Sequence, residues 1–326
     1  MHERNIPKFD ICNIPTYHKM GYTGKGIKIG VLDTPFKPCP AYGKIVHVLG
    51  SHISDKFASH GSAVCNVISQ IVPDAEIYML PFGVGSLEWC IDNDMDIVNY
   101  SANYAKNHRS SVFENLSKQA FNKGMILLTS AGNYGEENKL RFPGCLQEWI
   151  AVGAVRMEGG RIFLTNYSSY TKEKQKNTWN MVEVCGFTDI YVHYVGVDTY
   201  LPFGGTSCAS PFIAGMAALY FSYLGKTMNA EDFRRFKINN TLDLEEPGFD
   251  TRTGYGLFIL PELEEQKRMI ELWIGKKKYK VNGQEKEMDV APVIVNDRTM
   301  VPIRFVAEAF GKRVDWDDKD RKVTII

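Results

Sequence analysis

The sequence predicts an α/β protein with a doubly wound, mostly parallel sheet, followed by a small C-terminal α+β module. Several short apolar runs are continuous rather than alternating, and stretches of helical character separate them. Continuous apolarity is typical of parallel strands that helices cover on both faces. The alternation of strand and helix signals favours a doubly wound fold. A change of pattern after residue 260 indicates the separate module.

The elements of this fold can be placed along the chain. The expected strands cover residues 27–32, 77–80, 97–100, 125–129 and 150–152, and the expected helices cover 61–71, 111–123 and 207–223. The last helix is rich in alanine and glycine, which give it small faces for close packing. Pro211 falls in its first turn, where a missing backbone N–H does little harm.

Three polar residues lie just beyond predicted strands. They are Asp33, Ser101 and Asn133. In an open parallel sheet, ligands bind beyond the carboxyl ends of the strands. We therefore expect these three residues to share one edge of the sheet and to mark a functional site there.

The composition sets limits on class and partners. The chain has 326 residues and 44% hydrophobic content, enough for one large domain and one small one. Lys+Arg and Asp+Glu each total 38, so the net charge is zero and no nucleic acid or anionic membrane is expected as a partner. No apolar run is expected to span a membrane.

The N-terminus and the cysteines bear on location. No apolar stretch of signal-peptide type follows Met1, which predicts a cytoplasmic protein. The alternative is a surface or secreted protein whose signal was removed. The seven cysteines are scattered without a Cys-x-x-Cys pair, which favours reduced thiols, and a disulfide between distant cysteines is the alternative.

The parts of a serine hydrolase occur in separate segments. Ser207 lies in the run GGTSCASP at 204–211, His60 is followed by Gly61, and Asp33 ends an apolar strand. A hydroxyl nucleophile, an imidazole base and a carboxylate that orients it are the groups this chemistry needs. Ser207 should open a helix, whose N-terminal N–H groups help to bind an anion. An ordinary helix cap is the alternative reading of the run.

The motifs around these residues resemble those of the subtilisin-like (subtilase) serine proteases. The resemblance covers residues 14–260 and includes SAGN at 130–133, FPG at 142–144 and IAVGAV at 150–155. The chain order Asp, His, Ser also agrees with this family. The sequence departs from the family pattern at Pro35, where glycine is usual, and at Cys208.

The resemblance implies a serine endopeptidase that acts on protein or peptide substrates without a cofactor. Ser207 would attack the peptide carbonyl, while His60 would take the proton and later return it to the leaving amine. Asp33 would hold the imidazole in its reactive tautomer. The Asn133 amide and the Ser207 backbone N–H would bind the oxyanion.

The resemblance also assigns a substrate cleft, lined by Ser101, Ala102 and Asn103. The family has Ser-Leu-Gly-Gly where this chain has Ser-Ala-Asn-Tyr, so Asn103 and Tyr104 narrow that side. The resemblance implies that Arg141 would stand at the floor of the pocket for the residue before the scissile bond, where a cation would favour an acidic side chain. The alternative is an arginine turned to solvent.

Two further expectations concern metals and Cys208. The chain between His60 and the strand at 77–80 is too short for the calcium-binding loop of many subtilisins, and no metal site is expected. Cys208 adjoins the nucleophile at a helix N-terminus, where a thiolate is favoured and redox sensitivity would follow. The alternative is a buried, inert thiol.

The expected domains are a peptidase domain at 1–262, a charged helical linker at 263–269 and a small module at 270–326. The module should contain a hairpin turning at Gly283, a helix at 300–311 and a closing hairpin. It resembles the N-terminal domain of copper amine oxidase, through PVI at 292–294, NDRTMVPIR at 296–304 and Trp316-Asp317. The resemblance implies a surface or protein tether, and copper is not expected.

Two alternatives to a general endopeptidase stay open. Pro35, Asn103 and Tyr104 are consistent with a catalytically weak or inactive binding protein on the same scaffold. A narrow processing protease, whose substrate is docked by the C-terminal module, is the other.

Overall fold

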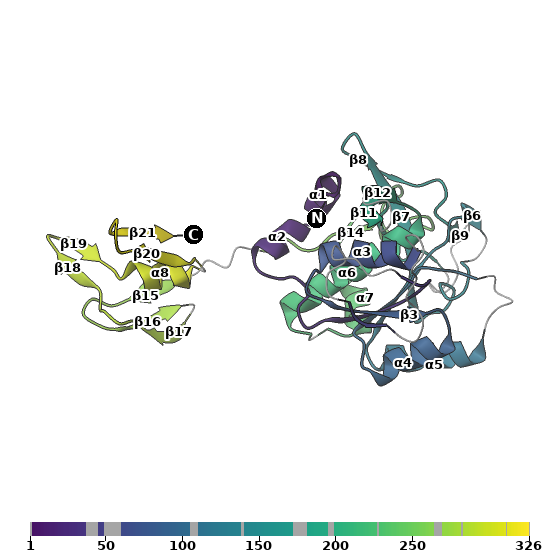
Figure 1. Cartoon of the computed structure of the whole chain (residues 1–326). Helices are drawn as coiled ribbons and strands as arrows, with labels where there is room; N and C mark the ends of the chain where they lie inside the picture. Colours follow the sequence, from purple (N-terminus) through teal and green to yellow (C-terminus); the bar gives the residue numbers. More distant parts are fainter. Residues whose placement is uncertain are drawn as a thin grey trace. The chain divides into compact units, whose positions relative to one another are not determined.

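The computed structural model describes residues 2–36, 45–48, 60–104, 110–137, 140–171, 181–194, 199–226, 228–263, 269–281, 283–310 and 312–325. It divides the chain into two compact units, Met1–Glu262 and Leu263–Ile326 (Figure 1).

The first unit is built on a ten-stranded sheet, which confirms the α/β class. Its order is β13-β14-β10-β7-β5-β4-β1-β3-β2, with β8 paired to β7. The bounds are β1 Lys28–Asp33, β2 Ile45–Val48, β3 Glu76–Pro81, β4 Ile97–Tyr100, β5 Ile126–Ser130, β7 Trp149–Glu158, β8 Arg161–Leu164, β10 Val184–Phe187, β13 Thr241–Leu242 and β14 Leu257–Phe258. All neighbours are parallel except β7–β8 and β13–β14.

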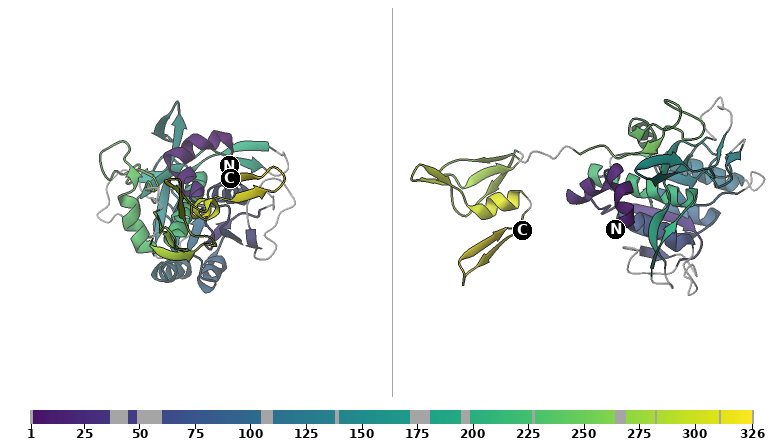
Figure 2. Two further views of the ribbon diagram at one scale, coloured as in Figure 1. Left: turned by 90° about the vertical axis from the view of Figure 1, so that its left-hand side faces the viewer. Right: turned by 90° about the horizontal axis from the view of Figure 1, so that it is seen from above.

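Helices cover both faces of this sheet (Figures 1 and 2). Their bounds are η1 Glu3–Asn5, α1 Ile6–Ile11, α2 Ile14–Lys19, α3 His60–Ile71, α4 Val84–Asp92, α5 Ser111–Asn122, α6 Thr206–Leu224 and α7 Ala230–Ile238. Val98 of β4 joins a core cluster with Leu87 of α4 and Phe113 of α5. The next residue, Asn99, accepts a hydrogen bond from Ser210 of α6 at 2.7 Å. Because successive strand residues face opposite sides, α6 lies on the other face from α4 and α5.

Among the described residues, one helix, α6, has the length and composition of a membrane span. However, 72% of its apolar window is buried inside the protein. Its apolarity has a packing cause, because it lies against the strands β4, β5, β7 and β10 and also against α3. Gly215 allows this approach, since an added Cβ would meet Ile71 at 3.0 Å.

Two small ribbons complete the first unit. β11 Ile190–Tyr194 pairs antiparallel with β12 Thr199–Phe203, and β6 Glu136–Glu137 pairs with β9 Tyr170–Thr171. Strand β7 extends well past the expected 150–152. Its second half forms a largely solvent-exposed hairpin with β8, and the exposed Arg156 and Glu158 interrupt the apolar signal there.

The described residues of the second unit form small antiparallel sheets and one short helix. The sheets are β15 Ile270–Leu272, β16 Lys278–Val281 and β17 Gln284–Glu287, then β18 Val293–Val295 with β19 Arg298–Met300, then β20 Val314–Asp317 with β21 Lys322–Ile325. The expected helix at 300–311 is wrong at its start, because Met300 belongs to β19 and α8 covers Ile303–Ala309. Pro302 is extended and precedes the helix. Residues 264–268 of the expected linker lie outside the described residues.

Candidate active site

The candidate site lies at the carboxyl edge of the central strands. Leu32 of β1 pairs with Tyr100 of β4, and Tyr100 pairs with Thr129 of β5. Because the three strands run parallel, the residues that follow these three are also neighbours across the sheet. Asp33 therefore lies beside Ser101, and Ser101 lies beside Ser130. Asn133 follows three residues later in the loop after β5. The three polar residues expected at one edge are thus brought to it.

Asp33 and His60 form a direct pair. His60 Nδ1 lies 2.7 Å from Asp33 Oδ1, and the Asp33 side chain is fully buried. The same oxygen accepts the Thr34 backbone N–H at 2.7 Å. Asp33 Oδ2 has no hydrogen-bond partner among the residues that the structure describes. An imidazole that donates from Nδ1 to a carboxylate presents Nε2 as the proton acceptor.

His60 is held in place by the start of α3. The Gly61 backbone N–H donates to Thr34 Oγ1 at 2.9 Å, which ties the helix to the end of β1. A Cβ at Gly61 would lie 2.3 Å from the Thr34 carbonyl oxygen, so glycine is required for this approach. The Phe203 ring stands edge-on to the imidazole, with 5.3 Å between the ring centroids. The imidazole keeps 34% of its surface exposed, open to a substrate.

Ser207 is the second residue of α6 and is half-buried. Its Oγ donates to the Ser101 carbonyl oxygen at 3.1 Å. His60 and Ser207, both described, share no hydrogen bond in this structure. Catalytic hydrogen bonds are often long or misaligned without substrate. The structure thus brings His60 to Asp33 and Ser207 to Ser101. His60 lies on α3 and Ser207 on α6, and these two helices pack against each other.

Asn133 is oriented by the first residue of α6. Its Oδ1 accepts both the backbone N–H and the hydroxyl of Thr206, each at 2.9 Å. With the oxygen engaged, the Nδ2 group is the half of the amide available to bind an anion. Gly205, at φ +82°, makes room for that group, since an added Cβ would lie 2.9 Å from Asn133 Nδ2. The N-terminal N–H groups of α6 add positive potential beside it.

The expected cleft segment is fixed by backbone pairing. Tyr104 and Phe142 exchange two hydrogen bonds, of 2.8 and 3.0 Å, just beyond Ser101, Ala102 and Asn103. Ala102 packs against the core cluster that contains Phe142, and Asn103 Oδ1 is buried without a hydrogen-bond partner in the described part of the chain. The segment is therefore tied to the backbone at Phe142 and carries one unsatisfied polar atom.

Arg141 contacts the loop that carries Asn133. Its guanidinium lies 3.7 Å from the centroid of the Tyr134 ring, and Tyr134 follows Asn133 directly. The arginine is half-buried, and the Tyr134 ring that it contacts is 51% exposed. Sequence reasoning missed Tyr134 as its partner, although Tyr134 adjoins a residue already singled out. It also missed Thr206, which adjoins Ser207, and Phe203, for which the sequence gives no signal.

Cys208 is the inert thiol of the two alternatives. It is fully buried, and burial raises the pKa of its thiol to about 12. The expectation of a favoured thiolate is wrong because desolvation outweighs the backbone hydrogen bond at Ile190 and the charge of the nearby Lys8, which both lower the pKa. The six described cysteines are all free. Within the described ranges, no group of three or more His, Cys, Asp or Glu side chains could hold a metal ion.

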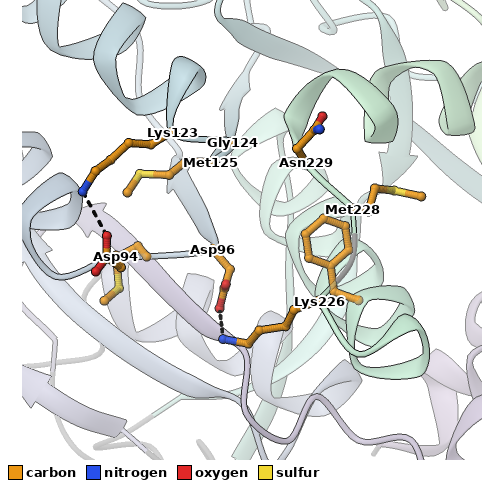
Figure 3. A pocket seen from close by; sticks show the side chains of 10 residues that line it. Asp94, Asp96, Lys123, Gly124, Met125, Lys226, Met228 and Asn229 are labelled. Atoms are coloured by element: carbon orange, nitrogen blue, oxygen red, sulfur yellow. Dashed lines mark hydrogen bonds and ion pairs between the residues drawn. The ribbon is translucent and has the colours of Figure 1, made fainter.

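A separate pocket lies at the opposite edge of the sheet (Figure 3). Asp96 and Met125, which line it, directly precede β4 and β5, whereas the candidate site follows these strands. Lys123 pairs with Asp94 at 2.9 Å, and Lys226 pairs with Asp96 at 2.8 Å. The charges that line this pocket neutralise each other, and none of the candidate site residues reaches it.

Comparison with known families agrees with this architecture. A model described as the subtilase family matches residues 24–256. A second model, the copper amine oxidase N-terminal domain, matches residues 262–325.

Individual proteins of known sequence share about a quarter of their aligned residues with this chain. The minor extracellular protease Epr of Bacillus subtilis (strain 168) is 27% identical over 266 residues, which cover 73% of this chain and 38% of that protein. Subtilisin Savinase of Lederbergia lenta is 27% identical over 228 residues, which cover 63% of this chain and 80% of that protein. This chain spans between 38% and 56% of the length of three such relatives.

Solved structures share the fold. A lanthipeptide protease superposes with a TM-score of 0.63 at 16% identity, covering 79% of this chain and 93% of that one.

Proposed function

The chain belongs to the subtilase family, and we propose that it is a serine endopeptidase that hydrolyses peptide bonds through Asp33, His60 and Ser207. The pairing of His60 with the buried Asp33 carries the proposal. A buried carboxylate on Nδ1 gives a histidine the tautomer that a general base needs. The helix-borne Ser207 on the adjacent element supplies the nucleophile.

The reaction follows from these groups. Ser207 Oγ attacks the scissile carbonyl carbon while His60 Nε2 takes its proton. The carbonyl oxygen becomes an oxyanion, which the Asn133 Nδ2 group and the Ser207 backbone N–H bind. The C–N bond then breaks, and His60 gives the proton to the leaving amine. Water then attacks the acyl carbon while His60 Nε2 takes its proton. The ester C–O bond to Ser207 Oγ breaks, and His60 returns the proton to that oxygen, which releases the acid product. For the first step, the Ser207 hydroxyl turns from the Ser101 carbonyl to His60.

Fluorophosphonate labelling tests the proposal. The intact protein at pH 8 should be covalently modified at Ser207, because the probe requires an activated serine beside a base. Peptide mapping by mass spectrometry locates the adduct. Heat-denatured protein and Ser207→Ala are the controls and should stay unlabelled. A folded wild-type protein that resists the probe would instead favour a binding protein on this scaffold.

Replacing Asn133 by alanine should slow turnover with little effect on KM. The side chain is proposed to bind the oxyanion, which exists only in the transition state. The equivalent asparagine of a subtilisin supplies the expected magnitude, a loss of about 100- to 1000-fold in kcat. Steady-state kinetics on a peptide substrate measure it. A large rise in KM with unchanged kcat would assign Asn133 to substrate binding.

Arg141 is proposed to favour an acidic residue before the scissile bond. A charge-assisted hydrogen bond to such a side chain is worth about 1.5–3 kcal/mol before desolvation. Cleavage of a peptide library should show the preference in the wild type, and Arg141→Gln should lose it. Tyr134→Phe, which keeps the ring under the guanidinium, is the matched control and should preserve it. An identical profile in Arg141→Gln would limit the arginine to its stacking role.

The C-terminal unit is proposed to bind or tether the protein rather than to take part in hydrolysis. Its described core is small, with Tyr279, Met288 and Ala309 as buried members.

We also propose that the protein is located in the cytoplasm. Fractionation of the producing cells tests this location.

A further inference from the structure

Three buried amide side chains line one edge of β11. Strand β11 pairs with β12 along its other edge. Asn5 and Asn66 are fully buried, and Gln70 is 9% exposed. Buried polar groups cost free energy unless they are hydrogen-bonded, and a strand edge needs partners for its backbone groups. The contacts of these amides therefore define what the edge is attached to.

Asn5 pairs with Tyr191 as a neighbouring strand would. Its Nδ2 donates to the Tyr191 carbonyl oxygen at 2.9 Å, and its Oδ1 accepts the Tyr191 N–H at 2.8 Å. Gln70 Nε2 donates to the same carbonyl at 2.9 Å. The N-terminal segment and α3 thus both bind one residue of β11.

The amides also bind one another. Asn5 Nδ2 donates to Gln70 Oε1 at 2.9 Å, and Gln70 Nε2 donates to Asn66 Oδ1 at 3.1 Å. Asn66 Oδ1 accepts the His193 backbone N–H at 3.0 Å, which adds a second attachment to β11. We call Asn5, Asn66 and Gln70 the amide network. It joins the N-terminal segment, α3 and β11 through directional bonds.

The elements that this network joins include α3, which carries the proposed base His60, and β11, whose partner strand β12 precedes the proposed nucleophile Ser207 in the chain. His60 is the first residue of α3, which also holds Asn66 and Gln70. β12, the partner of β11, ends at Phe203, whose ring contacts the His60 imidazole. Ser207 follows four residues later. The position of α3 along β11 therefore sets where His60 lies relative to the strand that leads into Ser207.

We propose that Asn5, Asn66 and Gln70 are positioning residues that hold His60 in register with Ser207. None of them is among the groups that react, so they act through α3. Apolar packing would bury the same surface, but hydrogen bonds fix the helix along the strand direction as well. The kinetic part of the inference rests on the proposed function. A misplacement of about 1 Å costs on the order of 100-fold in rate.

Gln70→Met tests the network, because methionine has a similar length and forms none of these hydrogen bonds. Ser69→Ala is the matched control, since Ser69 is also buried in α3 and, among the described residues, its hydroxyl bonds only to the Asn66 carbonyl within the helix. We expect fluorophosphonate labelling and kcat to fall about 10- to 100-fold in Gln70→Met, with KM nearly unchanged. Ser69→Ala should stay within about twofold of the wild type. Asn5→Ala repeats the test from outside α3 if Gln70→Met does not fold.

The outcomes separate this inference from the proposed function. A wild type that resists the probe overturns the function, and a wild type and Gln70→Met that label at equal rates overturn the positioning role. The His60 ring-proton chemical shifts, which sense the Phe203 ring, give a readout that does not need activity. They should move in Gln70→Met and not in Ser69→Ala. Unmoved shifts in Gln70→Met and Asn5→Ala overturn the positioning role, whether or not the protein hydrolyses peptides.

Discussion

Ser207→Ala should lose nearly all peptide hydrolysis while the protein stays folded. The hydroxyl is the only proposed nucleophile, and its removal leaves only the oxyanion donors and substrate binding. In a subtilisin, loss of the serine or the histidine lowers kcat by about 2 × 10⁶, and loss of the aspartate alone by about 3 × 10⁴. We expect the same order here, with His60→Ala equal to Ser207→Ala and Asp33→Ala less severe. Initial rates on a fluorogenic peptide measure it.

The three effects should not add, because the triad acts as one unit. The double variant Ser207→Ala with Asp33→Ala should be no slower than Ser207→Ala alone. Ser210→Ala is the matched control, as Ser210 is a buried serine of the same helix that bonds to Asn99. It should lose stability, about 1–3 kcal/mol for the unsatisfied amide oxygen, but keep its rate. Additive losses, or a Ser207→Ala variant with wild-type turnover, would refute the proposed mechanism.

The fold could be predicted from the sequence where a single physical cause dominates. The strand at 97–100 is predicted with the bounds that the structure has, because a short, mostly apolar segment between polar turns favours a buried strand, although Asn99 interrupts it. The second half of β7 was missed because a solvent-facing hairpin carries charges such as Arg156. Pro302 decided the start of α8, a local effect that the apolar pattern of the segment obscured.

In the candidate site, only the residues that lie within a recognisable sequence motif could be predicted. The residues with their own motif, such as Asp33 and Asn133, come to one sheet edge because strand order and register put them there. The contacts between distant segments could not be predicted. Nothing in the sequence pairs Asn5 with Tyr191, which are 186 positions apart. The burial of Cys208 is also a tertiary property, and it reverses the reactivity that its helix position suggested.

Glu183→Gln should destabilise the first unit strongly. Glu183 pairs with Lys237 and Arg234, each at 3.0 Å, and the side chains are 11%, 1% and 9% exposed, respectively. Removing one member of a buried ion pair leaves an uncompensated charge, which costs about 3–5 kcal/mol. Urea denaturation of the full chain, followed by far-UV circular dichroism, measures the change. Glu231→Gln is the matched control on α7, because its pair with Arg235 is exposed, and it should cost less than about 1 kcal/mol.

The pH dependence of this loss identifies Lys237 as its source. Burial lowers the pKa of Lys237, and Glu183 is the largest influence that opposes the shift. In Glu183→Gln the folded-state pKa should fall further, while the unfolded value stays near 10.4. Between these two values the unfolded state binds more protons, so stability rises with pH. The deficit of Glu183→Gln should therefore shrink from pH 7 toward pH 10. A deficit that stays constant over this range would mean that the loss comes from packing or hydrogen bonding and not from the buried lysine charge.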